Sequence, residues 1–130
     1  FRAFCTGIID VVNTHAAVVK FQSACFERLG SSGVALLGEL RQHASDAGLQ
    51  VILDAKRGDI GMTAVHYAKA ATADGPCDWI TVNPYLGIDG IEPFLEAAVV
   101  QQPALTDLRC KRAQCAQSRR GQCALLAQDR

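Results

Sequence analysis

The chain has 130 residues, of which 49% are hydrophobic and 20% are charged, and its formal net charge at pH 7 is zero. This composition is typical of a globular chain with one core and excludes a disordered one. No apolar run could span a bilayer, no signal-peptide pattern opens the chain, and no excess of positive charge would attract nucleic acid, so we expect a cytoplasmic protein without membrane or nucleic-acid partners.

Strand-like and helix-like patterns alternate as far as Ala98. Short runs rich in β-branched and apolar residues are separated by stretches whose apolar residues recur every three or four positions. Gly48 and Pro84 are suitable stops, because glycine favours helix ends and proline cannot continue a sheet ladder. In chain order the patterns predict a helix over 1–14, a strand over 15–21, a helix from Ser31 or Ser32 to Gly48, a strand over 49–54, a helix over 60–73, a strand over 79–83 and a helix over 88–98.

This alternation indicates parallel βαβ units whose strands are covered by helices, so the predicted fold class is α/β. The predicted strands are short and nearly continuously apolar, as expected for strands buried on both faces. Strand patterns alone do not separate a barrel from a doubly wound sheet. The choice between these two architectures has to come from the chemistry of the strand ends.

The character of the chain changes near residue 99. Up to Ala98 acidic residues outnumber basic ones, whereas from Val99 onward basic residues dominate, with several Gln and Cys and no aromatic residue. The stretch 99–130 shows no clear period, and we predict neither helix nor strand in it. We interpret 99–130 as a tail unrelated to the preceding domain, produced by a reading-frame change or a fusion.

Cysteine and histidine positions do not indicate a metal site. None of the six cysteines form a Cys-x-x-Cys pair, and neither His15 nor His43 has the spacing to a cysteine that zinc sites show. We therefore expect Cys5, Cys25 and Cys77 to be reduced thiols, and we predict no bound metal.

Charged residues gather where the predicted strands end. Asp54 and Lys56 lie two residues apart at the end of an apolar strand, so both side chains leave the same face. Lys20 occupies the matching end of the preceding strand, Asp59 lies just before the next helix, and Thr63 follows one turn later. Because the carboxyl ends of parallel strands share one edge, we expect two lysines and two aspartates to converge there.

A solvated salt-bridge cluster is the alternative interpretation of these charges. Paired opposite charges keep each other ionised, and such an array is costly to desolvate unless every member is paired. Here the charges directly follow the apolar run Val51–Leu53, and Gly58 and Gly61 keep the adjoining turn open. This combination favours a functional site over a surface cluster.

The stretch Asp54–Thr63 has the form Asp-x-Lys-x-x-Asp-Ile-x-x-Thr and resembles the signature of the orotidine 5′-phosphate decarboxylase family. The segments Val18–Gln22 and Phe26–Gly30 resemble the family's second strand and its loop. Thr81–Gly87 resembles the fourth strand in the bacterial subgroup related to mycobacterial enzymes. The resemblance covers residues 1–98 and implies a partial (β/α)8 TIM barrel, with roughly strands 2 to 4 present.

The resemblance implies a carboxy-lyase of UMP biosynthesis, which converts orotidine 5′-phosphate to UMP and carbon dioxide without metal or organic cofactor and works as a homodimer with shared sites. Lys56 would donate a proton to C6, and Asp54 would lie beside the departing carboxylate. Lys20 would orient these groups and contact the ribose, while Asp59 and Thr63 would reach substrate in the neighbouring subunit. The implied catalytic residues are Lys56, Asp54, Lys20 and Asp59, and the implied substrate-binding residues are Lys20, Asp59, Ile60, Thr63 and Asn83.

Two alternative interpretations of the chain's function remain open. The family's first strand, its phosphate-gripping loop and its last four strands have no counterpart that we recognise here, so this polypeptide is expected to be an inactive fragment, a non-catalytic truncated remnant. Magnesium-dependent sugar-phosphate decarboxylases of the same barrel superfamily share Asp-x-Lys-x-x-Asp. They carry an acidic residue at the position of Lys20, and a magnesium site typically has more carboxylate ligands than this segment provides.

Overall fold

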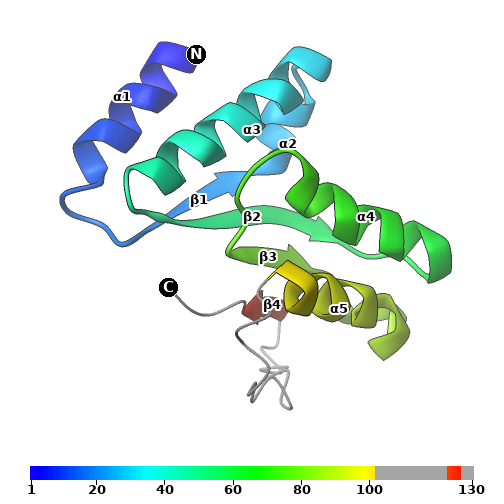
Figure 1. Ribbon diagram of the computed structural model, residues 1–130. Helices are drawn as coiled ribbons and strands as arrows, with labels where there is room; N and C mark the ends of the chain where they lie inside the picture. Colours follow the sequence, from blue (N-terminus) through cyan, green and yellow to red (C-terminus); the bar gives the residue numbers. More distant parts are fainter. Residues whose placement is uncertain (102–122, 127–130) are drawn as a thin grey trace.

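The computed structural model (Figure 1) describes residues 1–101 and 123–126. Helices and strands alternate through most of the described chain, as the α/β prediction requires. The elements are α1 (Arg2–Val12), β1 (Val18–Gln22), α2 (Ser23–Glu27), α3 (Ser31–Asp46), β2 (Gln50–Arg57), α4 (Gly61–Ala73), β3 (Trp79–Val82), the 3-10 helices η1 (Pro84–Leu86) and η2 (Ile88–Gly90), α5 (Glu92–Gln101) and β4 (Cys123–Leu126).

The described strands form one sheet in the order β1-β2-β3-β4. The pairs β1·β2 and β2·β3 are parallel, as predicted, and Val19 lies opposite Val51 while Leu53 lies opposite Ile80. Strand β4 is antiparallel to β3. The prediction that no strand follows residue 98 is therefore wrong at Cys123–Leu126. A four-residue apolar run is too short to show a period, and only its pairing with β3 identifies it as a strand.

The core lies between the sheet and its helices. In Figure 1, α1 and α3 lie on the same side of β1 and β2, and α5 lies beside β3. Successive strand residues point to opposite faces of a sheet, so every second side chain enters this core. The main cluster of buried side chains is Ile9, Phe21, Phe26, Leu36, Leu37, Leu40, Ala44, Leu49, Val51, Leu53 and Ala71.

A second, smaller cluster covers β3. Val82 packs with Ala68 of α4 and with Ile91 and Phe94 near the start of α5. Lys20, Asp54 and Thr81 alternate with the strand residues that face the helices. Their side chains therefore lie on the other face of the sheet. The apolar pattern of the strands thus fixes which face is free to carry a site.

Several local predictions need correction. Gly30, at φ +70°, is the N-cap of α3 in place of Ser31 or Ser32, and the Ser32 hydroxyl donates to the Leu29 carbonyl over 3.1 Å. Helix α3 ends at Asp46, close to the predicted stop at Gly48, which takes a left-handed conformation with φ +85°. The predicted helix over 88–98 divides into η2 and α5, and the short α2 was not predicted.

The apolar residues of α1 are buried only in part. Phe4 and Val11 are 69% and 66% exposed, whereas Ile9 is buried. The helix that packs against α1 is α3, and the contact involves Cys5, Ile9 and Val12. The periodicity predicted the helix, but it does not show which of its apolar residues α3 covers. None of the helices in the described ranges combines the length and apolar character needed to cross a membrane.

Candidate active site

The side chains at the carboxyl ends of β1, β2 and β3 meet around Asp54. Lys20 comes from β1, Asp54 and Lys56 come from β2, and Thr81 comes from β3. Asp54 is 6% exposed, whereas both lysine side chains remain about half exposed. A buried carboxylate is thus surrounded by two ammonium groups at the solvent boundary.

Three donors bind the Asp54 carboxylate. Lys20 Nζ lies 2.8 Å from Oδ2, Lys56 Nζ forms an ion pair with Oδ1, and the Thr81 hydroxyl donates to Oδ1 over 2.9 Å. Burial alone would raise the pKa of the Asp54 carboxyl, but the hydrogen bonds from Lys20, Lys56 and Thr81 outweigh it and hold that pKa well below its usual range. Asp54 is therefore ionised at neutral pH.

The backbone of Lys56 is held in a rarely populated conformation. Its φ is +50°, and it is the sole non-glycine residue in the described ranges with positive φ. The Lys56 N–H donates to Thr81 Oγ1 over 3.0 Å, which fixes the peptide against β3. Left-handed backbone costs an L-residue about 1–2 kcal/mol, and such strain often marks a functional position.

The turn after Lys56 lies tightly against the next strand. A Cβ at Gly58 would lie 3.0 Å from the Asn83 Cβ, and the Asn83 N–H donates to the Arg57 carbonyl over 2.6 Å. Residue 58 therefore has little room for a side chain. A glycine here lets the β2 turn approach the end of β3.

The other predicted site residues lie near this turn but do not join the array. Asp59 is half-buried, its Oδ1 accepts the Ile60 N–H over 2.8 Å, and it enters no ion pair within the described part of the chain. Ile60 and Thr63 are exposed at the start of α4. Asn83 Oδ1 accepts the Tyr85 N–H over 3.0 Å and caps η1. Of the four charges expected to converge, three do so.

Thr81 is the site residue that the sequence interpretation missed. The pairing of Leu53 with Ile80 places Thr81 beside Asp54 on the same face of the sheet. A usable signal was present, since Thr81 is the single hydroxyl in the otherwise apolar strand β3. Its partner could not be known without the register between the strands.

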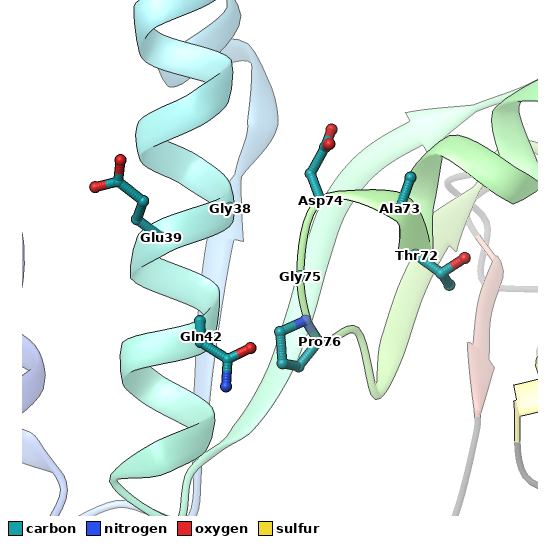
Figure 2. Close-up of a pocket in the computed structure, with 8 residues that line it drawn as sticks. All are labelled: Gly38, Glu39, Gln42, Thr72, Ala73, Asp74, Gly75 and Pro76. Carbon is teal, nitrogen blue, oxygen red and sulfur yellow. The ribbon is translucent and has the colours of Figure 1, made fainter.

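A polar hollow of ≈ 580 Å³ lies at the other end of the strands (Figure 2). The hollow is lined by Gly38, Glu39 and Gln42 on α3 and by Thr72–Pro76, which forms the end of α4 and the turn that leads towards β3. That turn precedes β3, whereas the Asp54 array lies where β3 ends. In parallel α/β folds, sites assemble at the carboxyl ends of the strands, so this hollow is separate from the array.

Three parallel strands, with helices on one face and an ionised lysine and aspartate array at their carboxyl edge, define a partial α/β barrel of the kind that carries enzyme sites. The sequence profile of the Orotidine 5′-phosphate decarboxylase / HUMPS family matches residues 2–125. The chain belongs to this family. The fold prediction and the resemblance are thereby confirmed.

Known proteins agree with this assignment. An orotidine 5′-phosphate decarboxylase of Rhodopirellula baltica is 48% identical, covering 74% of this chain and 34% of the relative. One of Salinispora tropica is 43% identical, covering 75% of this chain and 36% of the relative. The solved OMP decarboxylase of Leishmania donovani is 38% identical with a TM-score of 0.68, covering 75% of this chain and 38% of that structure.

The chain spans about a third of the length of the curated relatives that it matches. These relatives align with about three-quarters of the chain, whereas the family profile extends to residue 125. Most of the stretch 99–130 lies outside the described residues. Its interpretation as an unrelated tail therefore stays a prediction.

Proposed function

We propose that this chain carries part of the active site of an orotidine 5′-phosphate decarboxylase, which forms UMP and carbon dioxide in pyrimidine biosynthesis. The observation that carries the proposal is the contact of Lys20 and Lys56 with the buried Asp54 carboxylate at the strand ends. The names of the relatives support the choice of reaction.

The proposed reaction uses the array in one step of bond breaking and one of proton transfer. The bond between C6 and the carboxylate carbon breaks, its electron pair stays on C6, and carbon dioxide leaves. The Lys56 ammonium then gives a proton to C6 and is restored by water. An ammonium beside C6 stabilises the charge that develops there more than it stabilises the substrate, which is the condition for catalysis.

Asp54 contributes through its fixed negative charge. With its pKa held low, it stays ionised beside the substrate carboxylate, and the repulsion between the two is relieved when carbon dioxide forms. Lys20, bound to the other carboxylate oxygen, would orient Asp54 and contact the ribose. Neither task needs a metal ion or an organic cofactor.

We also propose that the active enzyme is a homodimer in which Asp59 and Thr63 reach the substrate of the neighbouring subunit. The turns around Asp59 carry apolar side chains that are open to solvent. The carbonyl of Asp59 would be 2.8 Å from a Cβ at Gly90, so the turn after β2 and η2 form one surface. Its exposed apolar side chains are Ile60, Met62, Tyr85, Leu86 and Ile88.

A cytoplasmic location belongs to the same proposal. Cys5, Cys25 and Cys77 are free thiols. Proteins that keep several unpaired cysteines are typical of reducing compartments.

Grafting tests the proposed function directly. Residues 1–98 of this chain would replace the matching segment of the R. baltica relative, and the loss of orotidine 5′-phosphate would be followed by absorbance. Turnover by the graft, abolished by Lys56→Ala and retained by Lys69→Ala on the exposed face of α4, is the expected result. A folded graft without turnover would refute the proposal, and the 130-residue chain assayed alone is expected to be inactive.

A further inference from the structure

Arg57 joins the end of β2 to two helices on the far side of the sheet from Asp54. Its guanidinium forms an ion pair with Glu27 at the end of α2 and lies over the ring of Tyr67 on α4, with Cζ 5.2 Å from the ring centroid. Glu27 is itself held by the Ser23 hydroxyl over 3.0 Å, and Ser23 is 4% exposed. Arg57 therefore has fixed partners on both neighbouring helices.

The backbone of Arg57 is anchored as firmly as its side chain. Its carbonyl accepts the Asn83 N–H over 2.6 Å, which ties it to the end of β3. Lys56 precedes this anchored residue, and its side chain leaves on the opposite face, towards Asp54. Arg57 is held on the helix side of the sheet, and the Lys56 side chain is held by Asp54 on the other side. These two contacts leave the backbone of Lys56 little freedom to leave its observed φ of +50°.

Apolar packing contributes little to holding the Arg57 side chain in place. Under Arg57 lies a hollow of ≈ 270 Å³, bordered by Leu37, Leu53 and Ala71 as well as by Glu27 and Tyr67. A side chain above unfilled space gains little from dispersion contacts. The ion pair and the aromatic ring are therefore what hold the guanidinium in place.

We propose that Glu27 and Arg57 form a positioning clamp, which holds the strained backbone of Lys56 and so aims its ammonium at Asp54. Neither clamp residue belongs to the charged array, and each acts through Lys56. The importance of the clamp for catalysis rests on the proposed function, but the clamp itself can be tested without substrate.

The direct test is the rate at which an amine-selective acetylating reagent modifies Lys56 in the 130-residue chain, measured by mass spectrometry. The exposed Lys69 on α4 is the internal reference. An ammonium held by a carboxylate reacts slowly, because only the free amine attacks. In Arg57→Gln, we expect the ratio of the Lys56 rate to the Lys69 rate to rise roughly threefold, the scale of a partly exposed ion pair.

The direction of the change separates positioning from other effects. Loss of a nearby positive charge would by itself favour the ammonium and slow the modification of Lys56. General destabilisation would raise the rates of both lysines together. Tyr67→Leu, which leaves the charge unchanged, should raise the ratio in the same direction. A ratio that stays level or falls in both folded variants would overturn the clamp, and a specific rise in either supports it.

Kinetics of the grafted enzyme give the second readout. Glu27→Gln and Arg57→Gln should lower kcat while KM stays near its original value, because Lys56 acts on the departing charge and not on substrate binding. Arg57→Lys keeps the ion pair and should restore most of kcat. Unchanged kcat in an active graft overturns the clamp. If the labelling ratio rises but the graft never turns over substrate, the clamp stands and the proposed function fails.

Discussion

The Thr81 hydroxyl donates a hydrogen bond to Asp54 Oδ1 over 2.9 Å, from the neighbouring strand β3 to the end of β2. Thr81 Oγ1 in turn accepts the backbone N–H of Lys56 over 3.0 Å. One hydroxyl thus orients the carboxylate and supports the strained peptide of the proposed proton donor.

Replacing Thr81 by Val keeps the shape of the side chain and removes both hydrogen bonds. The pKa of Asp54 should rise towards its usual range, and kcat of the grafted enzyme should fall roughly tenfold, as expected for the loss of a hydrogen bond to a charged group. Thr72→Val is the matched control, because the Thr72 hydroxyl bonds within α4 to the Lys69 carbonyl. Equal kcat for the two variants would contradict a role for Thr81.

The low pKa of Asp54 predicts how stability depends on pH. Because the folded-state pKa lies below the unfolded value of about 3.9, the ionised carboxylate stabilises the fold above that unfolded value. This stabilisation is lost as the pH falls below about 4 and approaches the folded-state pKa. The difference in unfolding free energy between the chain and Asp54→Asn should therefore be constant near neutral pH and shrink in acid.

Denaturant unfolding at a series of pH values would measure this dependence. Asp89→Asn is a suitable control, because Asp89 is exposed in η2 and should show no comparable trend. A difference for Asp54→Asn that stays constant down to the lowest accessible pH would mean that the carboxylate is not held by the lysines in the folded state.

Arg41 should be essential for stability although it lies far from the array. Its side chain is 2% exposed and donates to the carbonyls of Pro76 over 2.9 Å, Ala71 over 2.6 Å and Gly75. Burial lowers the pKa of Arg41, partly offset by Cys77 and Asp74. Arg41→Met would remove this donor from the Ala71 carbonyl near the end of α4 and from the Gly75 and Pro76 carbonyls in the turn that follows.

We expect Arg41→Met to lower the free energy of unfolding by about 3 kcal/mol. The fluorescence of Trp79, the single tryptophan of the chain, would follow the transition. Arg28→Met is the control, because Arg28 is exposed and its loss should change stability little. A loss of less than about 1 kcal/mol would show that water satisfies these carbonyls equally well.

The sequence was most informative where chemistry and local pattern coincide. Asp54 and Lys56, two positions apart after an apolar run, were expected on one face and are in contact. Lys20 was placed by counting to the end of the preceding strand, and it reaches the same carboxylate. These inferences needed only the alternation of a strand and the shared edge of parallel neighbours.

Contacts that depend on register or on packing partners were not predictable. The role of Thr81 follows from the pairing of β3 with β2, in which the register shifts between Leu53 and Arg57. Asp59 was expected among the charges, but its carboxylate turns back to the Ile60 N–H, a local bond that competes with distant partners. Phe4 is exposed although it belongs to the apolar spacing of α1, because periodicity shows that a helix is amphipathic and not which neighbour covers it.

Chelation distinguishes the proposed decarboxylase from the magnesium-dependent sugar-phosphate decarboxylases. Both oxygens of Asp54 already accept hydrogen bonds from ammonium groups, and Lys20 places positive charge where a cation would have to bind. Magnesium prefers several oxygen ligands, and no group of three His, Cys, Asp or Glu gathers within the described residues. Turnover of orotidine 5′-phosphate by the grafted enzyme should therefore survive excess EDTA. The assay would compare initial rates before chelation, after chelation and after magnesium is added back. Activity that disappears with EDTA and returns with magnesium would assign this site to the sugar-phosphate chemistry instead.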